Sequence, residues 1–302
     1  NSPEPVNSPE PVNSPEPVNS PEPINSPESI SSPGPIESPQ PKRPKFMNSL
    51  NVVALTTMWR KECLRFLRIW IQTLLPPAII MTLYFVIFGN LIGSRIGKMG
   101  GFSYMEFIVP GLIMMAVITN AYSNVSSSFY GAKYSHHIEE MQISPIPNII
   151  IMLGFITGGV VRGLCVGVTV AMVSQIFTDF SMHNPLVIIV VAILTAFLFS
   201  IAGLINAVFA KSFDDVSIVP TFVLTPLTYL GGIFYSIKML PEFWQQVSLA
   251  NPILYMVNSF RYGFRGTSDI DLTTAISVIV LFIVILFGIC LTLLERGTGV
   301  RQ

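Results

Sequence analysis

The chain has 302 residues, of which 51% are hydrophobic and only 11% are charged, and its mean hydropathy is +0.60. A soluble domain carries about 25% charged residues, so most of this chain must face lipid rather than water. The formal net charge is zero, which removes any electrostatic argument for nucleic-acid binding. Cys63, Cys165 and Cys290 are widely separated, and their spacing predicts neither a disulfide framework nor a metal site.

Residues 1–46 form a proline-rich segment unlike the rest of the chain. The hexapeptide NSPEPV begins at Asn1, Asn7 and Asn13 and then drifts in sequence. Proline at every second or third position removes backbone donors, and few residues could build a core. We therefore expect a disordered or polyproline-like tail. Two interpretations stay open: a solvated tail without a role, and a tether for a cytoplasmic partner.

A basic amphipathic segment, Leu50–Arg68, precedes the first long apolar run. Its apolar residues, such as Met58 and Trp59, alternate with basic residues, such as Arg60 and Lys61. This pattern predicts a helix that lies in the inner membrane–water interface. The alternative is a simple cytoplasmic extension of the first span.

Six apolar runs are candidates for transmembrane helices, each of which needs about 20 residues. They are residues 70–91, 107–130, 148–177, 185–210, 216–235 and 273–294. The predicted fold is therefore an all-α membrane protein with six transmembrane helices, and residues 47–302 form its transmembrane domain. An even number of spans puts both ends of the chain on one side of the membrane.

Lysine and arginine indicate which side that is, because short cytoplasmic loops are enriched in both. With both termini inside, the inner segments contain Lys42, Arg43, Lys45, Arg60, Lys61, Arg65, Arg68, Lys133, Lys211, Arg296 and Arg301. The outer segments then contain only Arg95, Lys98, Lys238, Arg261 and Arg265. We therefore expect both termini in the cytoplasm.

The polar segment 131–147 joins the second and third predicted spans on the cytoplasmic side. Glu139 and Glu140 precede Met141 there, which predicts a short helix with exposed acids and an apolar edge. Such a helix suits docking to another protein, and a plain interhelical loop is the alternative. A second candidate contact, or simply a solvated turn, lies before the fifth span at Asp214 and Asp215.

Polar side chains inside the predicted spans are candidates for a pathway through the membrane. Arg162 lies roughly 20 Å from the start of the third span, at about 1.5 Å per residue, where an arginine usually faces the bundle interior or a wet cavity. A helix–helix pair or snorkelling toward the outer headgroups is the alternative. Asn120 and Asn124 are four residues apart and share a helix face. Lining a pathway and ordinary interhelical hydrogen bonding are equal alternatives for that face.

The fifth predicted span is broken by prolines and ends at two glycines. Pro220 and Pro226 each remove a helical hydrogen bond, and Gly231 and Gly232 follow. We therefore expect this span to be the moving gate element.

Residues 236–263 are too apolar for an ordinary loop and too interrupted for a spanning helix. Non-helical backbone at membrane depth is tolerated only where protein or a water-filled cavity satisfies it. This pattern predicts an external re-entrant helical hairpin between the fifth and sixth spans. Its candidate residues are Pro241, Trp244, Asn251, Pro252 and Tyr255.

Four segments carry a resemblance to a known family. They are RIWIQTLLPPAIIMTLYFVIFGNLIGSRIG at 68–97, FSYMEFIVPGLIMM at 102–115, FDDVSIVPTFVLTPLTYLGGIFYS at 213–236 and NPILYMVNSFRYGF at 251–264. Together with the layout above, they make residues 47–302 similar to the ABC-2 type permeases, and within these to the YadH-like inner-membrane permeases of bacteria. The N-terminal repeats lie outside the resemblance.

The resemblance implies the permease subunit of an ABC transporter, usually an exporter, in which two permease chains and two ATP-binding chains assemble in the bacterial inner membrane. Residues 131–147 would then be the coupling helix, residues 50–68 the connecting helix, and the hairpin an outer cap on the pathway. No cofactor, metal or catalytic residue is implied in this chain, since ATP and magnesium belong to the partner. The substrate does not follow from the fold.

A nucleotide site in this chain is not expected. Gly93–Met99 comes nearest to a phosphate-binding loop, but its glycines are too close together and Met99 stands where Ser or Thr would hold magnesium. Two other functions stay open: a membrane scaffold that binds a partner without moving solute, and an ion-driven transporter. The second lacks the inverted repeat of broken helices that such transporters often show.

Overall fold

The computed structural model describes residues 45–99, 101–178 and 182–297. The predicted proline-rich tail, apart from its last two residues, lies outside the described residues. In chain order the elements are α1 (Lys45–Arg68), α2 (Trp70–Tyr84), the π-helical segment η1 (Phe85–Ile92), α3 (Gly93–Ile96), β1 (Lys98–Met99), β2 (Phe102–Ser103), α4 (Tyr104–Tyr134), α5 (His137–Ile143), α6 (Asn148–Ser174), α7 (Pro185–Phe209), α8 (Phe213–Val219), the π-helical segment η2 (Pro220–Leu224), α9 (Thr225–Leu230), the 3₁₀ turn η3 (Ile237–Met239), α10 (Glu242–Leu249), α11 (Pro252–Arg265) and α12 (Leu272–Arg296).

Five helices within the described residues are long and apolar enough to cross a membrane. They are Trp70–Gly89, Tyr104–Tyr134, Asn148–Ser174, Pro185–Phe209 and Leu272–Arg296. These correspond to five of the six predicted spans, and they make the chain an all-α membrane protein. Local sequence explains where two of them begin. Asn184 caps α7 by accepting a hydrogen bond from the backbone of Val187, and Ser103 caps α4 through a reciprocal bond with Glu106.

The predicted fifth span differs from the expectation. In the structure its helical run begins at Phe213, passes through η2 and ends at Leu230 rather than at Tyr235. At about 1.5 Å per residue this run reaches roughly 27 Å, less than the bilayer core of about 30 Å. It ends early because Gly232 adopts a left-handed backbone (φ 71°) that a helix does not allow. The structure therefore supports five full-length spans and one shorter, interrupted helix.

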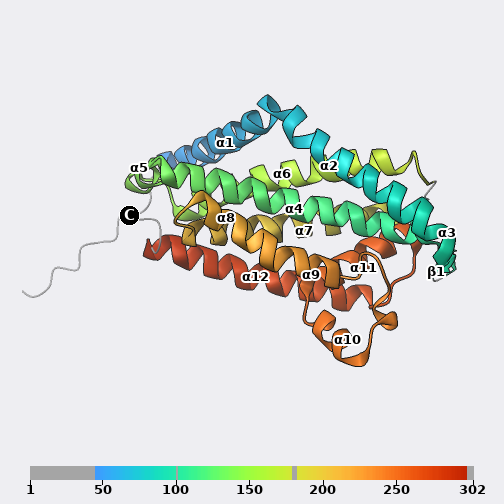
Figure 1. Cartoon of the computed structure of the whole chain (residues 1–302). Coiled ribbons are helices and arrows are strands. Elements are labelled where there is room, and N and C mark those ends of the chain that lie inside the picture. Colours follow the sequence, from blue (N-terminus) through green and yellow to red (C-terminus); the bar gives the residue numbers. More distant parts are fainter. Residues whose placement is uncertain (1–44, 100, 179–181, 298–302) are drawn as a thin grey trace, which may run out of the picture. The chain divides into compact units, whose positions relative to one another are not determined.

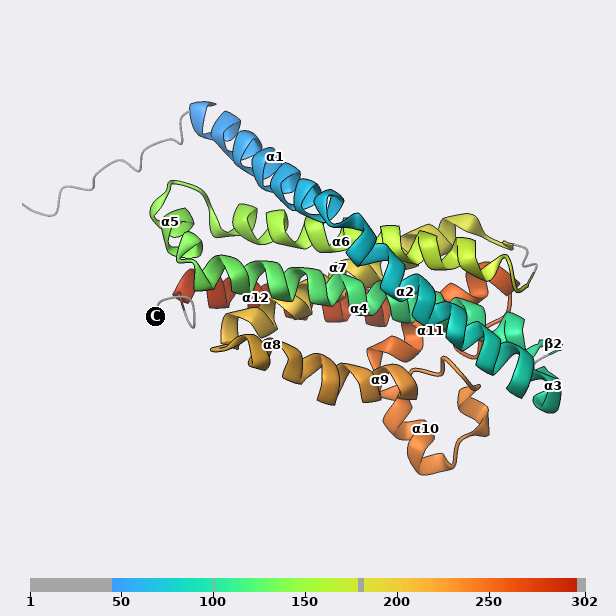
Figure 2. The ribbon, with the colours of Figure 1, turned by 45° about the horizontal axis from the view of Figure 1, so that its top comes forward.

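The two ends of the helical bundle differ. Figures 1 and 2 show the axes of the long helices roughly aligned, with α5 and the end of α12 at one end and α3 at the other. The short antiparallel pair β1–β2 lies beside α3, with Met99 opposite Phe102. The hairpin helices α10 and α11 lie toward the end that carries α3. The α5 end therefore corresponds to the predicted cytoplasmic side.

Helix α4 is the centre of the bundle, with 78% of its spanning window buried, against 17% for α2 and 11% for α12. It packs mainly between α6 and α7, where small residues allow a close approach. A Cβ added at Gly163 of α6 would lie 2.9 Å from the Cβ of Ala121 on α4. A Cβ added at Gly203 of α7 would lie 2.4 Å from the carbonyl oxygen of Tyr122. The outer helices α2 and α12 thus keep most of their surface for lipid or for another chain.

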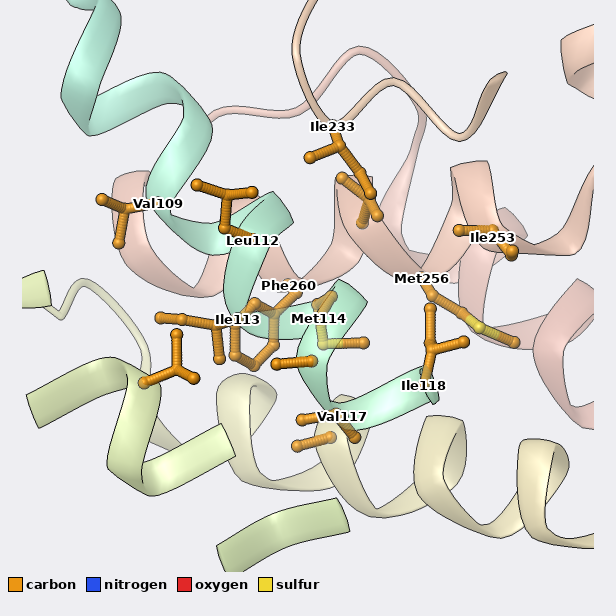
Figure 3. Close-up of a cluster of buried hydrophobic side chains, with 14 of the residues drawn as sticks. Val109, Leu112, Ile113, Met114, Val117, Ile118, Ile233, Ile253, Met256 and Phe260 are labelled. Carbon is orange, nitrogen blue, oxygen red and sulfur yellow. The ribbon is translucent and has the colours of Figure 1, made fainter. Parts of the chain in front are cut away.

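The core continues beneath the hairpin. Figure 3 shows α4 side chains, among them Leu112 and Met114, beside Ile233 and beside Met256 and Phe260 of α11. All five of these side chains are buried. Helix α11 is thus part of the bundle core rather than a loose external loop.

Candidate functional site

The predicted coupling segment contains a short helix at the α5 end of the bundle (Figure 1). The chain leaves α4 through His136, whose left-handed backbone (φ 58°) turns it into α5. Ile138 is 1% exposed and packs against the bundle, whereas Ile143 is 86% exposed and Glu140 is also exposed. Glu139 and Met141 are half-buried, and Glu139 lies 3.3 Å from the imidazole of His136. The helix thus has one side fixed to the bundle and an acidic, partly apolar side that faces outward.

A polar turn between α7 and α8 is tied to the end of α4 that leads into α5. The buried ammonium of Lys133 donates to the carbonyls of Val208 and Ala210, both at 2.8 Å. The hydroxyl of Tyr130 donates to the carbonyl of Lys211 at 2.9 Å. The end of α4 is therefore hydrogen-bonded directly to the residues that lead into α8.

Asp214 and Asp215 have different roles in this turn. The Asp215 carboxylate accepts from the backbone N–H of Lys211 at 2.9 Å and of Ser212 at 3.0 Å, and Ser212 in turn caps α8. These hydrogen bonds, that from Lys211 first, hold the pKa of Asp215 below its usual range. Asp214 is exposed. Of the two predicted contact residues, Asp215 caps a helix, and Asp214 is the one available to a partner.

A buried polar cluster joins α1, α4 and α6. The Glu62 side chain is 2% exposed and accepts from Arg65 at 3.0 Å and from the hydroxyl of Ser128 at 2.9 Å. Arg65 also donates to the side-chain oxygen of Asn124 at 2.8 Å. Arg162 reaches the same Asn124 oxygen at 3.5 Å. We call these five residues the arginine cluster.

A cavity of about 330 Å³ lies beside the arginine cluster, between α2, α4 and α6. Its polar lining includes Arg162, Asn120 and Gln72, and Ile80 and Met81 of α2 are among its apolar lining. The two asparagines of the predicted face, Asn120 and Asn124, therefore lie in different surroundings. Asn120 lines the cavity, whereas Asn124 is 2% exposed and bridges two arginines by interhelical hydrogen bonds.

The predicted gate residues lie where helical geometry changes. Pro220 opens η2 and Pro226 lies in the first turn of α9, and the hydroxyl of Thr225 compensates by donating to the Pro220 carbonyl at 2.9 Å. A hydrogen bond between the hydroxyls of Tyr84 and Tyr229, 3.5 Å apart, joins this run to α2. Gly231 and Gly232 follow, and a Cβ added at Gly231 would lie 2.6 Å from a side-chain carbon of Ile253.

The predicted hairpin consists of α10 and α11, and most of its candidate residues hold its own shape. Asn251 caps α11 and donates to the carbonyl of Leu227 at 2.6 Å, and Pro252 occupies the first turn. The hydroxyl of Tyr255 donates to the carbonyl of Leu249 at 2.7 Å. Pro241 precedes α10, and Trp244 is 45% exposed. That the hairpin enters the membrane stays a prediction.

Sequence reasoning did not predict the burial of Arg261 or Glu62. Arg261 was counted only as a charge of the outer segments, but it is 3% exposed, donates to the carbonyl of Gly232 at 2.8 Å and lies 3.9 Å from the ring centroid of Phe107. Glu62 was not singled out, although it is the one acid in a basic helix and lies three residues before Arg65, a spacing typical of an ion pair.

Comparison with known proteins agrees with this architecture. The model of the family described as ABC-2 type transporter matches residues 53–264, which run from α1 to the end of α11. The inner membrane transport permease YadH of Escherichia coli K12 is 59% identical over 256 residues, covering 85% of this chain and all of that protein.

More distant relatives cover nearly the same region. Nodulation protein J of Neorhizobium galegae is 22% identical over 248 residues, 82% of this chain and 94% of that protein. Nodulation protein J of Rhizobium leguminosarum bv. trifolii is 23% identical over 249 residues, again 82% and 94% of the two chains. On the extent of the family match and the identity to YadH, the chain belongs to the ABC-2 type transporter family.

Proposed function

We propose that this chain is the membrane-spanning subunit of an ABC exporter in the bacterial inner membrane, in which two copies form the pathway and a separate ATP-binding chain supplies the energy. Membership of the ABC-2 family and the name of the YadH relative support transport and the location. The 302 residues contain no GxxxxGK[S/T] loop for phosphate binding. We therefore assign ATP and magnesium to two copies of the partner chain.

The acidic helix α5 is the observation that carries this proposal. It is fixed to the bundle by Ile138 and presents Glu140 and Ile143 outward, a charged and apolar surface suited to a groove on a partner. Because Lys133 and Tyr130 tie the same end of α4 to the α7–α8 turn, a push on α5 reaches the interrupted helix that starts at α8. Asp214 adds a second acidic contact on this side.

The gate is placed where α2 meets α9. Both helices join a π-helical segment, η1 or η2, and prolines interrupt both runs, so each can bend without breaking a regular hydrogen-bond ladder. Large apolar side chains remain exposed on them, including Leu83 on α2 and Phe222 on η2. We place the seam between the two copies along this surface, lined by the first, second and fifth spans.

The hairpin α10–α11 is assigned the role of an outer cap. It is joined to the gate through Arg261 and Gly232, so bending at Gly231 and Gly232 would move the cap together with α9. In the cycle we propose, ATP binding closes the partner subunits, α5 passes the motion to α4 and α6, and the seam opens outward. An amphipathic substrate then leaves on the external side.

The decisive experiment reverses the charge of the coupling helix. The double substitution Glu139→Lys and Glu140→Lys changes one half-buried and one exposed carboxylate of α5 and no residue of a long helix, so insertion into the membrane should be unaffected. Transport and substrate-stimulated, vanadate-sensitive ATP hydrolysis by the complex should fall by about tenfold or more, since several charge-complementary contacts are lost. Glu295→Lys, at the exposed end of α12, supplies the charge-reversal control.

Three outcomes would contradict the proposal. Unchanged transport in the α5 double mutant would show that α5 does not couple the subunits. Stable co-purification with an ATP-binding chain but no transport of any substrate would favour the alternative, a membrane scaffold. Transport driven by an ion gradient without ATP would favour the secondary-transporter alternative.

A further inference from the structure

The arginine cluster has an excess of positive charge. It contains two guanidinium groups, Arg65 and Arg162, and a single carboxylate, that of Glu62. The Glu62 oxygens are already engaged by Arg65 and by Ser128. Among the described residues no carboxylate pairs with Arg162. A cationic group at this depth is costly unless an anion or polar groups compensate it.

Arg162 is also short of hydrogen-bond partners. Its bond to Asn124 is 3.5 Å long, and it shares that oxygen with Arg65, which holds it at 2.8 Å. Its buried Nε has no partner within the described part of the chain. A guanidinium carries five donors arranged in a planar fork that matches two oxygens of a carboxylate or phosphate. Most of that donor capacity is unused here.

Arg162, with its unused hydrogen-bond donors, is part of the wall of a cavity. The other polar residues of the wall are largely occupied: Thr73 and Thr119 donate to carbonyls of their own helices, and so does the amide nitrogen of Asn120. The apolar part of the wall includes Ile80 and Met81. A volume of about 330 Å³ is within the range of small-molecule sites. The site thus offers one strong anion donor beside an apolar surface.

We propose that this cavity binds an anionic amphiphile, with its carboxylate or phosphate group on Arg162 and its apolar part along α2. Asn124 positions the guanidinium from behind, and Glu62 prevents Arg65 from competing for the same anion. This inference rests on the proposed function, because it gives the substrate of the export pathway its chemical class: a negatively charged, lipid-like molecule. It concerns the binding step alone.

Binding of radiolabelled dodecyl phosphate to the full chain in phosphatidylcholine nanodiscs tests the proposal. Empty nanodiscs correct for partition into lipid. Arg162→Gln should weaken binding about tenfold or more, the effect of losing a charge-assisted hydrogen bond. Arg162→Lys should weaken it less, because the charge remains but the fork is lost. Arg60→Gln, an exposed arginine on α1, is the matched control and should bind as the unmodified chain does.

Competition separates a lipid-like anion from a free one. Unlabelled dodecyl phosphate should displace the probe, and inorganic phosphate and dodecylamine at the same concentration should not. Displacement by inorganic phosphate would overturn the amphiphile assignment, and displacement by dodecylamine would overturn the requirement for negative charge. Equal binding by Arg162→Gln and the unmodified chain would overturn the site itself.

Two features of the design keep the result clear. If Arg162→Gln does not insert, Arg162→Lys and the competition series on the unmodified chain decide the question. The measurement uses neither ATP nor a partner, so failure of the coupling-helix experiment leaves the binding result standing. Conversely, if the probe does not bind selectively, the proposal of ATP-driven transport is not affected.

Discussion

Single buried charges organise this bundle, and each is compensated by groups from distant parts of the chain. Lys133 is compensated by two carbonyls at the end of α7, Arg261 by the Gly232 carbonyl and the Phe107 ring, and Glu62 by Arg65 and Ser128. Removing one partner leaves an unpaired polar group, which costs more than the pair contributes. Substituting one of these residues should therefore lower the stability of the fold in a measurable way.

Glu62→Gln should lower the free energy of unfolding by about 1–3 kcal/mol, the usual effect of leaving a buried charged group without its partner. Arg65 is 33% exposed, so solvent screening keeps the loss moderate. The loss of stability would be measured by heating both proteins in mild detergent and quantifying the folded fraction by size-exclusion chromatography. Glu295→Gln at the exposed end of α12 is the matched control and should have no effect.

Removing both charges of the Glu62–Arg65 pair supplies a second test of the same cluster. The double variant Glu62→Gln with Arg65→Gln should be less unstable than the sum of the two single variants, because neither charge is then left alone. Strict additivity would mean that the Glu62–Arg65 contact contributes nothing to folding.

At the scale of elements, helix boundaries followed the sequence where local chemistry fixes them. The predicted span 185–210 and the observed helix Pro185–Phe209 agree because Asn184 caps the start and Pro185 suits the first turn. The fifth span was predicted too long because its apolar run continues past Gly231, where packing against Ile253 and the left-handed Gly232 end the helix. Apolarity alone cannot locate such an end.

The cap of α8 should be sensitive to its two polar residues. Ser212→Ala should destabilise the first turn of α8 by about 1 kcal/mol, and Asp215→Asn should also weaken it, because each removes one half of the capping box. Amide hydrogen exchange at Asp215 and Val216 would report the fraying. Asp214→Asn is the matched control. Equal protection in all three variants would contradict this role.

The lowered pKa of Asp215 sets the pH range over which its carboxylate stabilises α8. Its folded pKa lies below the unfolded value of about 3.9, so its contribution is present above that value and is lost only as pH falls through the lowered folded pKa. The stability difference between Asp215→Asn and the unmodified chain should therefore be constant between about pH 6 and pH 8. A difference that fades within that range would mean that another group titrates there.

At the scale of the whole molecule, the sequence predicted the number of long spans better than the contacts between them. Apolar runs specify the spans because lipid demands an apolar exterior. The arginine cluster depends on residues about 60 positions apart, such as Arg65 and Asn124, that meet only after α1 packs near α4 and α6. No local pattern in the sequence encodes that meeting: the i,i+3 spacing indicates the Glu62–Arg65 ion pair, but not its contacts with Ser128 and Asn124.

The orientation prediction also belongs to the whole molecule. Its argument counted Lys133 as inside and Arg261 as outside, and the structure buries both. Setting both aside removes one charge from each side, so the excess of lysine and arginine on the predicted cytoplasmic side is unchanged. In the structure α5 lies at one end of the bundle and the hairpin lies toward the other. The charge count therefore predicts that α5 faces the cytoplasm and the hairpin faces outward, which can be tested.

A membrane-impermeant maleimide should distinguish the two ends. In a background with Cys63, Cys165 and Cys290 replaced by serine, a single cysteine is introduced by Lys238→Cys beside the hairpin or by Glu140→Cys on α5. Reagent added outside spheroplasts should label the first variant and not the second, and lysis should make the second reactive. The opposite pattern would put α5 outside the cell, where no ATP-binding chain could reach it, and would contradict both the orientation and the proposed coupling role.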